Sequence, residues 1–261
     1  MITAETPLRR GPELSRRYTT ADLGVLTRGE ARRFLPEDGT DPQGDAALDW
    51  ELLYRLEPEL YDGLVSAERL HPGVLDWLPH DVGRIVEVGA GTGRLTLELV
   101  DRAKEVVAVE PAAPLREVLA RKLSREDRGH RVRLVHGFFD DLPVADHSAD
   151  LVVSCSALTP APSHGGDVGL AEMERVCTPG GTVVIVWPNN LDWLASRGYR
   201  HASFAGEMFL EFASREEAAE MAAIFYPRAL EEVRRLGSGR VPYALLGMNP
   251  PRDLACKTME P

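Results

Sequence analysis

The stretch that decides the fold reads Ile85-Val86-Glu87-Val88-Gly89-Ala90-Gly91-Thr92-Gly93-Arg94. Its apolar first half predicts a short buried strand, and residues 95–100 predict the start of a helix. Glycine has no Cβ, so a strand that turns into a helix through glycines lets a ligand approach backbone N–H groups closely. We therefore predict a ligand-binding turn at residues 89–93.

Two families use a turn of this kind, and the spacing of the glycines separates them. Dinucleotide-binding domains require a third small residue that lets helix and strand pack closely. Counted from Gly89, that position is Arg94, which is large and charged, whereas glycines fall at 89, 91 and 93. This spacing, preceded by Glu87, resembles motif I of the class I S-adenosylmethionine-dependent methyltransferases. A nucleotide-cofactor oxidoreductase stays a weaker alternative, because no hydride-transfer constellation accompanies the turn.

The next apolar run, residues 105–109, ends in Glu110. A carboxylate at the end of the second strand, about 20 residues after the glycine turn, is placed to accept both hydroxyls of a ribose. An ordinary solvated carboxylate is the alternative. The resemblance continues through Pro111 and implies that Leu115 packs on the adenine. A helix is expected from Pro114 to about residue 124, with proline in its first turn.

The chain departs from the family pattern after the third predicted strand, residues 132–136. The family often places an aspartate directly after the next glycine, where it accepts a hydrogen bond from the adenine amino group. Phe138 stands at that place here. We expect backbone groups and rings of Phe138 and Phe139 to read the adenine instead, with Asp140 as the fallback acceptor. Core packing of both phenylalanines is the alternative.

The remaining pattern predicts the fold class. Strands are expected at 150–158 and 180–187, the second after the turn Pro179-Gly180-Gly181, with a helix at 167–177 between them. Helices thus alternate with buried strands from about residue 72 to 187, which favours a parallel sheet covered on both faces. The resemblance implies an α/β three-layer sandwich whose mostly parallel seven-stranded sheet has an antiparallel last strand.

The flanking segments predict a cap and a tail. We expect residues 1–70 to form an N-terminal arm and helical cap, and residues 71–261 the Rossmann-like domain. We expect residues 36–44 to form a loop. Residues 46–65 show a helical pattern that Pro58 interrupts. Residues 208–212 suggest the sixth strand, and 214–236 a helix that Pro227 kinks or divides. Residues 241–248 and 253–257 suggest the final antiparallel strand, with a bend between them.

The amino-acid composition and net charge limit the classes of partner that we expect. A net charge of −11 disfavours a protein that grips nucleic acid through phosphates. No apolar run is long enough for a membrane span, and the N-terminus has no signal core. Three widely spaced cysteines, Cys155, Cys177 and Cys256, suggest reduced thiols in the cytoplasm and offer no metal-ligand pattern. We expect a cytoplasmic protein with no metal, membrane or nucleic-acid partner; a homodimer is an open possibility.

The resemblance implies the site and its chemistry. Glu87 would hold the amino group of the donor, S-adenosylmethionine, and the glycines would let its methionine portion approach the backbone. The expected donor residues are Glu87, Gly89, Ala90, Gly91, Gly93, Glu110, Pro111, Leu115, Phe138, Phe139, Asp140 and Ser154. N-terminal helices cover the donor site in many relatives, so Tyr54 and Tyr61 are candidates to touch donor or acceptor, with core packing as the alternative.

The expected activity is methyl transfer to a small-molecule acceptor, on oxygen or nitrogen, in a biosynthetic role such as specialised metabolism. A hydroxyl acceptor needs a general base, and His164 lies in a loop after the fourth strand, at the rim where such sheets bind ligands. His164 is our candidate base, and a solvent-facing loop histidine is the alternative. A non-catalytic S-adenosylmethionine-binding partner or regulatory protein is the alternative function.

Overall fold

The computed structural model describes residues 12–35, 45–125 and 127–261. A seven-stranded sheet forms its centre, in the order β3-β2-β1-β4-β5-β9-β6. The strands are β1 (Val82–Val88), β2 (Ala103–Val109), β3 (Val132–Val135), β4 (Ala149–Cys155), β5 (Cys177–Val186), β6 (Arg200–Ser203) and β9 (Asp253–Thr258). β1 to β5 pair in parallel, and β9 runs antiparallel to both β5 and β6. The predicted sheet is confirmed, and its last strand lies between β5 and β6.

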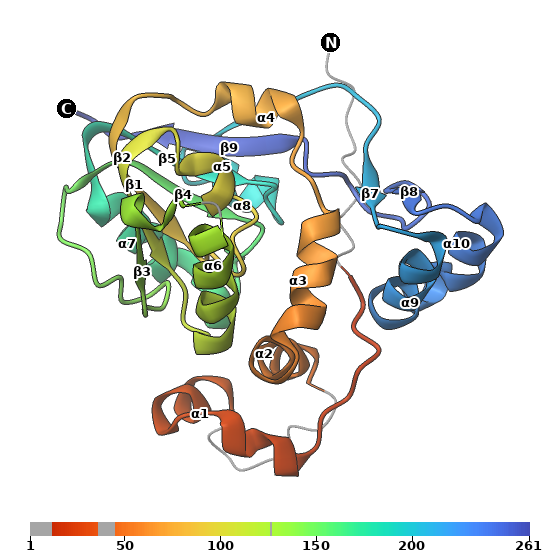
Figure 1. Ribbon diagram of the computed structural model, residues 1–261. Helices are drawn as coiled ribbons and strands as arrows, with labels where there is room; N and C mark the ends of the chain where they lie inside the picture. The colour runs from red at the N-terminus through yellow and green to blue at the C-terminus, as the bar shows by residue number, and fades with distance from the viewer. Residues whose placement is uncertain (1–11, 36–44, 126) are drawn as a thin grey trace.

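Helices cover both faces of this sheet (Figure 1). They are α4 (Pro72–Trp77), α5 (Thr96–Leu99), α6 (Ala113–Arg125), α7 (Gly166–Val176) and α8 (Leu191–Ala195), with the short 3-10 turns η2 (Gly129–Arg131) and η3 (Pro162–His164). Successive strand residues enter opposite layers: Val106 packs in one core cluster with Leu99, and Val107 in another with Met173. Burial on both sides explains the continuous apolar strands and confirms the three-layer architecture.

The expected proline-glycine turn before the fifth strand is a bulge within β5. Ala149 of β4 pairs with Cys177, but the next paired residues are Leu151 and Thr182. Residues 178–181 therefore stand opposite Asp150 alone, and Gly180 adopts a φ of +77° there. A bulge of this kind needs a residue that accepts a left-handed conformation, which glycine does.

The N-terminal part forms η1 (Thr20–Val25), α1 (Arg28–Phe34), α2 (Ala46–Leu56) and α3 (Pro58–Ala67). The Asp45 carboxylate caps α2 by accepting from two backbone N–H groups. Pro58 occupies the first turn of α3, which confirms the predicted interruption of the helix. The predicted loop at 36–44 lies outside the described residues. Figure 1 shows α2 and α3 between the sheet and a small lobe formed by residues 209–242.

That lobe corrects the prediction of the sixth strand. Residues 209–211 form β7 (Phe209–Glu211), which pairs only with β8 (Arg240–Pro242) in a separate two-stranded sheet. Between them lie α9 (Arg215–Phe225), η4 (Pro227–Ala229) and α10 (Leu230–Leu236), so Pro227 does divide the helix. The sixth strand of the main sheet is β6, and a turn follows β8 within the predicted strand 241–248. A short apolar run fits either sheet, and its partner is chosen by tertiary packing.

Among the described residues, no helix is both long enough and apolar enough to cross a bilayer.

Candidate functional site

A cavity of about 540 Å³ lies where the carboxyl ends of the parallel strands meet the cap helices. Its floor includes residues directly after β1, β2 and β4, and its opposite wall includes residues of α1, α2 and α3. Open α/β sheets bind ligands at this edge, next to the point where the strand order reverses. Here the order reverses between β1 and β4.

The glycine turn supplies a backbone surface that side chains would block. Gly89, Gly91 and Gly93 have φ values of +76°, +56° and +98°, a region that other residues rarely adopt. A Cβ on Gly89 would lie 2.8 Å from the Ala157 Cβ, and one on Gly91 would lie 3.6 Å from the Tyr61 ring. Gly89 and Gly91 line the cavity together with Ala90.

Gly93 has a different task from the other two glycines. It is absent from the cavity wall. A Cβ there would collide with the Leu119 side chain of α6. Gly93 therefore lets the turn pack against α6, and the sequence prediction that it contacts the donor gains no support from its position.

Glu110 is held rigidly at the end of β2. Its Oε2 accepts from the Gly91 N–H at 2.9 Å, and its Oε1 accepts from the Ala112 N–H at 2.9 Å. Burial raises the pKa of this carboxyl to about 7, against the lowering effect of those two N–H groups. Each oxygen keeps lone pairs for a ligand. Pro111 and Leu115, also predicted, line the cavity beside it.

Glu87 lies under the glycine turn, 1% exposed, and also lines the cavity. Its Oε2 accepts from the Thr96 hydroxyl at 2.5 Å. Burial raises the pKa of Glu87 to about 8, although the Thr96 hydrogen bond and the Arg94 charge act in the opposite direction. A buried carboxyl of this kind gains from a cationic ligand group, because such a group restores the favourable environment that burial removed.

Phe138, Phe139 and Asp140 line one end of the cavity, as predicted. The sequence did not indicate that Arg33 of α1 reaches them. Its Nη1 donates to both Asp140 carboxylate oxygens, at 2.7 and 2.8 Å, and its guanidinium lies 4.0 Å from the Phe138 ring centre. Asp140 is thus engaged by an arginine, so it is a less available acceptor for an adenine amino group than the sequence suggested.

Ser154 does not line the cavity. It is fully buried within β4, and the residues that reach the cavity from this strand are Cys155, Ser156 and Ala157. Ser156 adopts a φ of +59°, and Trp187, directly after β5, adopts +52°. Left-handed backbone at such residues is costly and often marks functional sites. Two strand ends are bent in this way toward one cavity, a feature that apolar periodicity in the sequence does not reveal.

The cap contributes an aromatic wall. Tyr54 and Tyr61 both line the cavity, and their rings meet edge to face with centroids 4.8 Å apart. Trp50, one turn before Tyr54, also lines the cavity and stacks on Phe225 of α9 with centroids 5.8 Å apart. Tyr54 and Tyr61 therefore line the cavity and also pack α2 against α3. A place in the cavity wall and a role in helix packing do not exclude each other, and contact with donor or acceptor stays a prediction.

His164 reaches the cavity from η3. Its Nδ1 lies 3.0 Å from the Ser163 Oγ. The next residue, Gly165, has no room for a Cβ because the Cβ would collide with the Leu158 side chain, and the Phe139 Cβ would lie 3.0 Å away. His164 is thus near the Phe139 end of the cavity.

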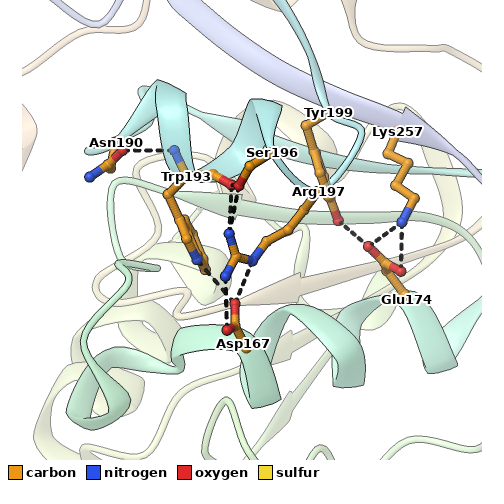
Figure 2. A network of polar contacts seen from close by, with 8 residues as sticks. All are labelled: Asp167, Glu174, Asn190, Trp193, Ser196, Arg197, Tyr199 and Lys257. Atoms are coloured by element: carbon orange, nitrogen blue, oxygen red, sulfur yellow. Dashed lines mark hydrogen bonds and ion pairs between the residues drawn. The ribbon is translucent and has the colours of Figure 1, made fainter.

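A polar network fixes the helix that follows His164. Figure 2 shows Asp167, at the start of α7, facing Trp193 and Arg197. The Asp167 carboxylate accepts from the Trp193 indole at 3.1 Å and from two nitrogens of Arg197 at 2.5 and 2.8 Å. At the other end of α7, Glu174 accepts from Lys257 of β9. The loop that carries His164 is therefore tethered to a helix with both ends anchored.

A buried ion pair was also missed. The Arg94 Nη1 lies 2.5 Å from the Glu68 Oε2, with side chains 12% and 5% exposed, and both residues line the cavity. From the sequence, Arg94 was only an argument against a dinucleotide site. The sequence did not mark Glu68, at the end of α3, as a site residue, because its contact with Arg94 spans 26 residues.

A buried triad of charged side chains supports the cap. Arg55 of α2 binds Glu30 of α1 at 2.7 Å and Glu51 of its own helix at 2.7 Å, and all three side chains are nearly inaccessible. Glu51 lines the cavity. Among the described residues, no group of three or more His, Cys, Asp and Glu side chains is arranged to hold a metal ion.

Residues 85–181 match the family model described as a methyltransferase domain. This segment is therefore similar to methyltransferase domains. The match begins in β1 and ends in the β5 bulge, so the matched segment contains the glycine turn, Glu110 and His164.

Curated relatives extend over the same region. An uncharacterised methyltransferase of Mycobacterium tuberculosis is 35% identical over 133 residues, 49% of this chain and 50% of that protein. One of Geobacillus kaustophilus is 33% identical over 112 residues, 42% of this chain and 50% of that protein. The chain thus spans about half the length of the curated relatives it matches.

Solved structures are more distant. The YcgJ protein of Bacillus subtilis superposes with a TM-score of 0.46 at 14% identity, covering 73% of this chain and 100% of that one. A SAM-dependent methyltransferase of Aquifex aeolicus gives 0.42 at 14% identity, covering 60% and 86%.

Proposed function

We propose that this protein transfers the methyl group of S-adenosylmethionine to an oxygen or nitrogen of a small-molecule acceptor in a biosynthetic reaction. The methyltransferase domain supports the reaction type. The observation that carries the proposal is Glu110, whose two oxygens are fixed by backbone N–H groups at the strand-end edge of the cavity. A rigid, buried carboxylate with free lone pairs is suited to the two neighbouring hydroxyls of a ribose.

The residues present fit this donor. Gly89 and Gly91 leave a cradle that a Cβ would fill, and Glu87 offers a buried carboxyl below it. Pro111 and Leu115 continue the wall toward Phe138 and Phe139 at the adenine end. When bound, S-adenosylmethionine supplies a methyl group activated by its sulfonium charge.

The chain's own contribution is placement. Reactions of this kind are accelerated chiefly by holding the acceptor in line with the methyl group. The bent backbone at Ser156 and Trp187 fixes the wall where the fourth and fifth strands end. Tyr54 and Tyr61 cover the opposite side and exclude water. An aromatic cavity of about 540 Å³ falls in the range of small-molecule sites, which supports a small acceptor.

His164 stays our candidate base, and its position makes the role testable. If His164 removes the acceptor proton, His164→Ala will leave donor affinity unchanged and lower kcat by about a hundredfold or more, a typical contribution of a general base. An unchanged rate would remove His164 from the mechanism.

The proposal as a whole is tested by methyl transfer. The protein is incubated with donor labelled on the methyl group and fractions of a small-metabolite library. Label appearing in a small product, and absent with Glu110→Ala, supports the proposal. Donor binding without transfer to any fraction would favour the alternative of a non-catalytic partner or regulatory protein.

Three further predictions belong to this proposal. We propose that residues 1–70 act as the arm and cap and residues 71–261 as the Rossmann-like domain. A cytoplasmic location is also expected, and a homodimer stays the open alternative to a monomer. Light scattering of the purified chain tests the dimer: a mass near twice 28.7 kDa supports it, and a mass near 28.7 kDa excludes it.

A further inference from the structure

Glu51 of α2 is a buried carboxylate in the cavity wall that the cap helices form. Its side chain is 10% exposed, and it lines the cavity. Its Oε2 accepts from the Arg55 Nη1 at 2.7 Å, and no described residue is hydrogen-bonded to its Oε1. An ionised carboxylate has about four lone-pair sites, so Glu51 keeps most of them for a ligand.

The charges of the buried triad do not balance at Glu51. Arg55 is one guanidinium bound to two carboxylates, Glu30 and Glu51, so the triad keeps one negative charge in excess. Burial raises the pKa of Glu51 despite Arg55, whereas the pKa of Glu30 is lowered because hydrogen bonds from Arg55 and Thr27 outweigh its burial. Glu51 is therefore the member of the triad that gains most from a further cation.

The cavity wall as a whole carries more carboxyl groups than cationic groups. Among the described residues that line it, two are arginines, Arg33 and Arg94, and five have carboxyl groups: Glu51, Glu68, Glu87, Glu110 and Asp140. Arg33 is paired with Asp140, and Arg94 with Glu68. The proposed donor engages Glu87 and Glu110. Glu51 is then the carboxylate of the wall that no group of the donor uses.

Aromatic rings and a histidine surround this carboxylate. Trp50 and Tyr54 belong to the same helix as Glu51, and both line the cavity. The faces of aromatic rings attract cations, so rings beside a carboxylate favour an ammonium group over a neutral hydroxyl. His164 of η3 interacts electrostatically with Glu51, so the candidate base lies near any group that Glu51 binds.

We propose that Glu51 binds the acceptor, and that the acceptor is a protonated amine on an apolar body. This inference rests on the proposed function and narrows its oxygen or nitrogen to nitrogen. The ammonium supplies the charge that the triad lacks, and the aromatic side chains of the cap pack on the apolar body.

The reaction of such an acceptor balances with the groups present. The ammonium first loses one proton to His164, which frees the nitrogen lone pair. That lone pair forms the new bond to the methyl carbon, while the bond from carbon to sulfur breaks and its electron pair neutralises the sulfonium. The product is a methylated ammonium with the charge of the original acceptor, and His164 passes the one released proton to water.

The experiment compares amines with alcohols of the same shape. The probes are phenethylamine with phenethyl alcohol, and tryptamine with tryptophol. Transfer from donor labelled on the methyl group gives kcat and KM, and calorimetry gives the affinity for S-adenosylhomocysteine. Both are measured for the wild type, Glu51→Gln and Glu30→Gln. Glu30→Gln is the matched control, because each variant removes one carboxylate from Arg55 but Glu30 does not line the cavity.

We expect the wild type to label the amines with a kcat/KM at least tenfold above that of the alcohols. Glu51→Gln will raise KM for the amines about tenfold or more, the loss typical of a charge-assisted hydrogen bond, and change the affinity for S-adenosylhomocysteine less than twofold. Glu30→Gln will change both quantities less than twofold. Chemical denaturation shows whether the two variants are folded, and the preference for amines in the wild type tests the inference without either of them.

Four results would overturn the inference while the proposed function stands. They are alcohols labelled as well as amines, no label in any amine although S-adenosylhomocysteine binds, equal rises of KM in the two variants, and a loss of S-adenosylhomocysteine affinity in Glu51→Gln as large as the rise in KM. The last would make Glu51 a donor residue. If the wild type does not bind S-adenosylhomocysteine, the proposed function itself fails, and this result needs neither a variant nor an acceptor.

Discussion

The floor and the roof of the cavity are built by different means. The floor, from Glu87 to Glu110, is made by the glycine turn and the strand ends beside it, through backbone groups such as the Gly91 N–H, which donates to the Glu110 carboxylate. The roof, α1 to α3, is held by side-chain pairs between helices, such as Arg55 with Glu30. The floor, which holds the proposed donor site, is thus encoded by a motif, whereas the roof that encloses the cavity is encoded by tertiary contacts.

The largest effect is expected in the roof, from Arg55→Met. Removing the guanidinium leaves Glu30 and Glu51 buried without their partner, which costs about 3–5 kcal/mol. Chemical denaturation measures this loss. Arg215→Ala is the control, since the Arg215–Glu216 pair is exposed and its removal should leave the stability nearly unchanged. Equal losses in the two variants would mean that the buried triad does not hold the roof.

The floor is tested by a pair of glycines with the same backbone conformation. Gly89 and Gly180 have φ values of +76° and +77°, but a Cβ on Gly89 meets Ala157 at 2.8 Å while one on Gly180 meets nothing within 4 Å. Alanine at either position should cost about 1–2 kcal/mol of stability from left-handed strain, and Gly89→Ala should cost more because its Cβ also collides with Ala157.

Only Gly89→Ala should also weaken binding of S-adenosylhomocysteine, by about tenfold or more, because its methyl group intrudes on the donor cradle. Calorimetric titration of S-adenosylhomocysteine into both variants measures the two affinities. Unaltered affinity in Gly89→Ala would show that the turn does not carry the donor.

A smaller effect is expected from pH. Burial raises the pKa of Glu87 to about 8 and that of Glu110 to about 7, so the folded protein holds protons that the unfolded chain releases above about pH 4.5. The stability of the free protein should therefore fall as the pH rises from about 4.5 to 8.

Glu87→Gln should remove part of this slope and stabilise the free protein at pH 8 by on the order of 1 kcal/mol. Thermal unfolding across this pH range measures it. If the wild-type stability rises between pH 5 and 8 and Glu87→Gln leaves that rise unchanged, the raised pKa of Glu87 is contradicted.

The sequence predicted the sheet and the floor well because both depend on local patterns. Apolar runs located β1 to β5, and Gly89, Gly91 and Glu110 located the floor of the cavity; their contact with the donor stays a prediction. The sixth strand was placed wrongly, because a three-residue strand such as β7 contains too little pattern to choose a partner. Ser154 was assigned to the site because strand register cannot tell which residue at a strand end turns outward. In the structure the bent Ser156 occupies that place.

The roof could not be predicted to the same depth. Arg33 reaches Asp140 across 107 residues, and Arg94 reaches Glu68 across 26. Neither pair has a spacing that a helix or strand would reveal. The departure at Phe138 did mark the right region, since this is where Arg33 covers the ring and engages Asp140.

The most direct test of the central claim is calorimetric titration of S-adenosylhomocysteine into the wild type and into Glu110→Ala. We expect one saturable site in the wild type. In the variant we expect a loss of about 1–3 kcal/mol of binding free energy, the amount expected when charge-assisted hydrogen bonds to a ribose are removed. Equal affinity in the two proteins, or no binding by the wild type, would contradict it.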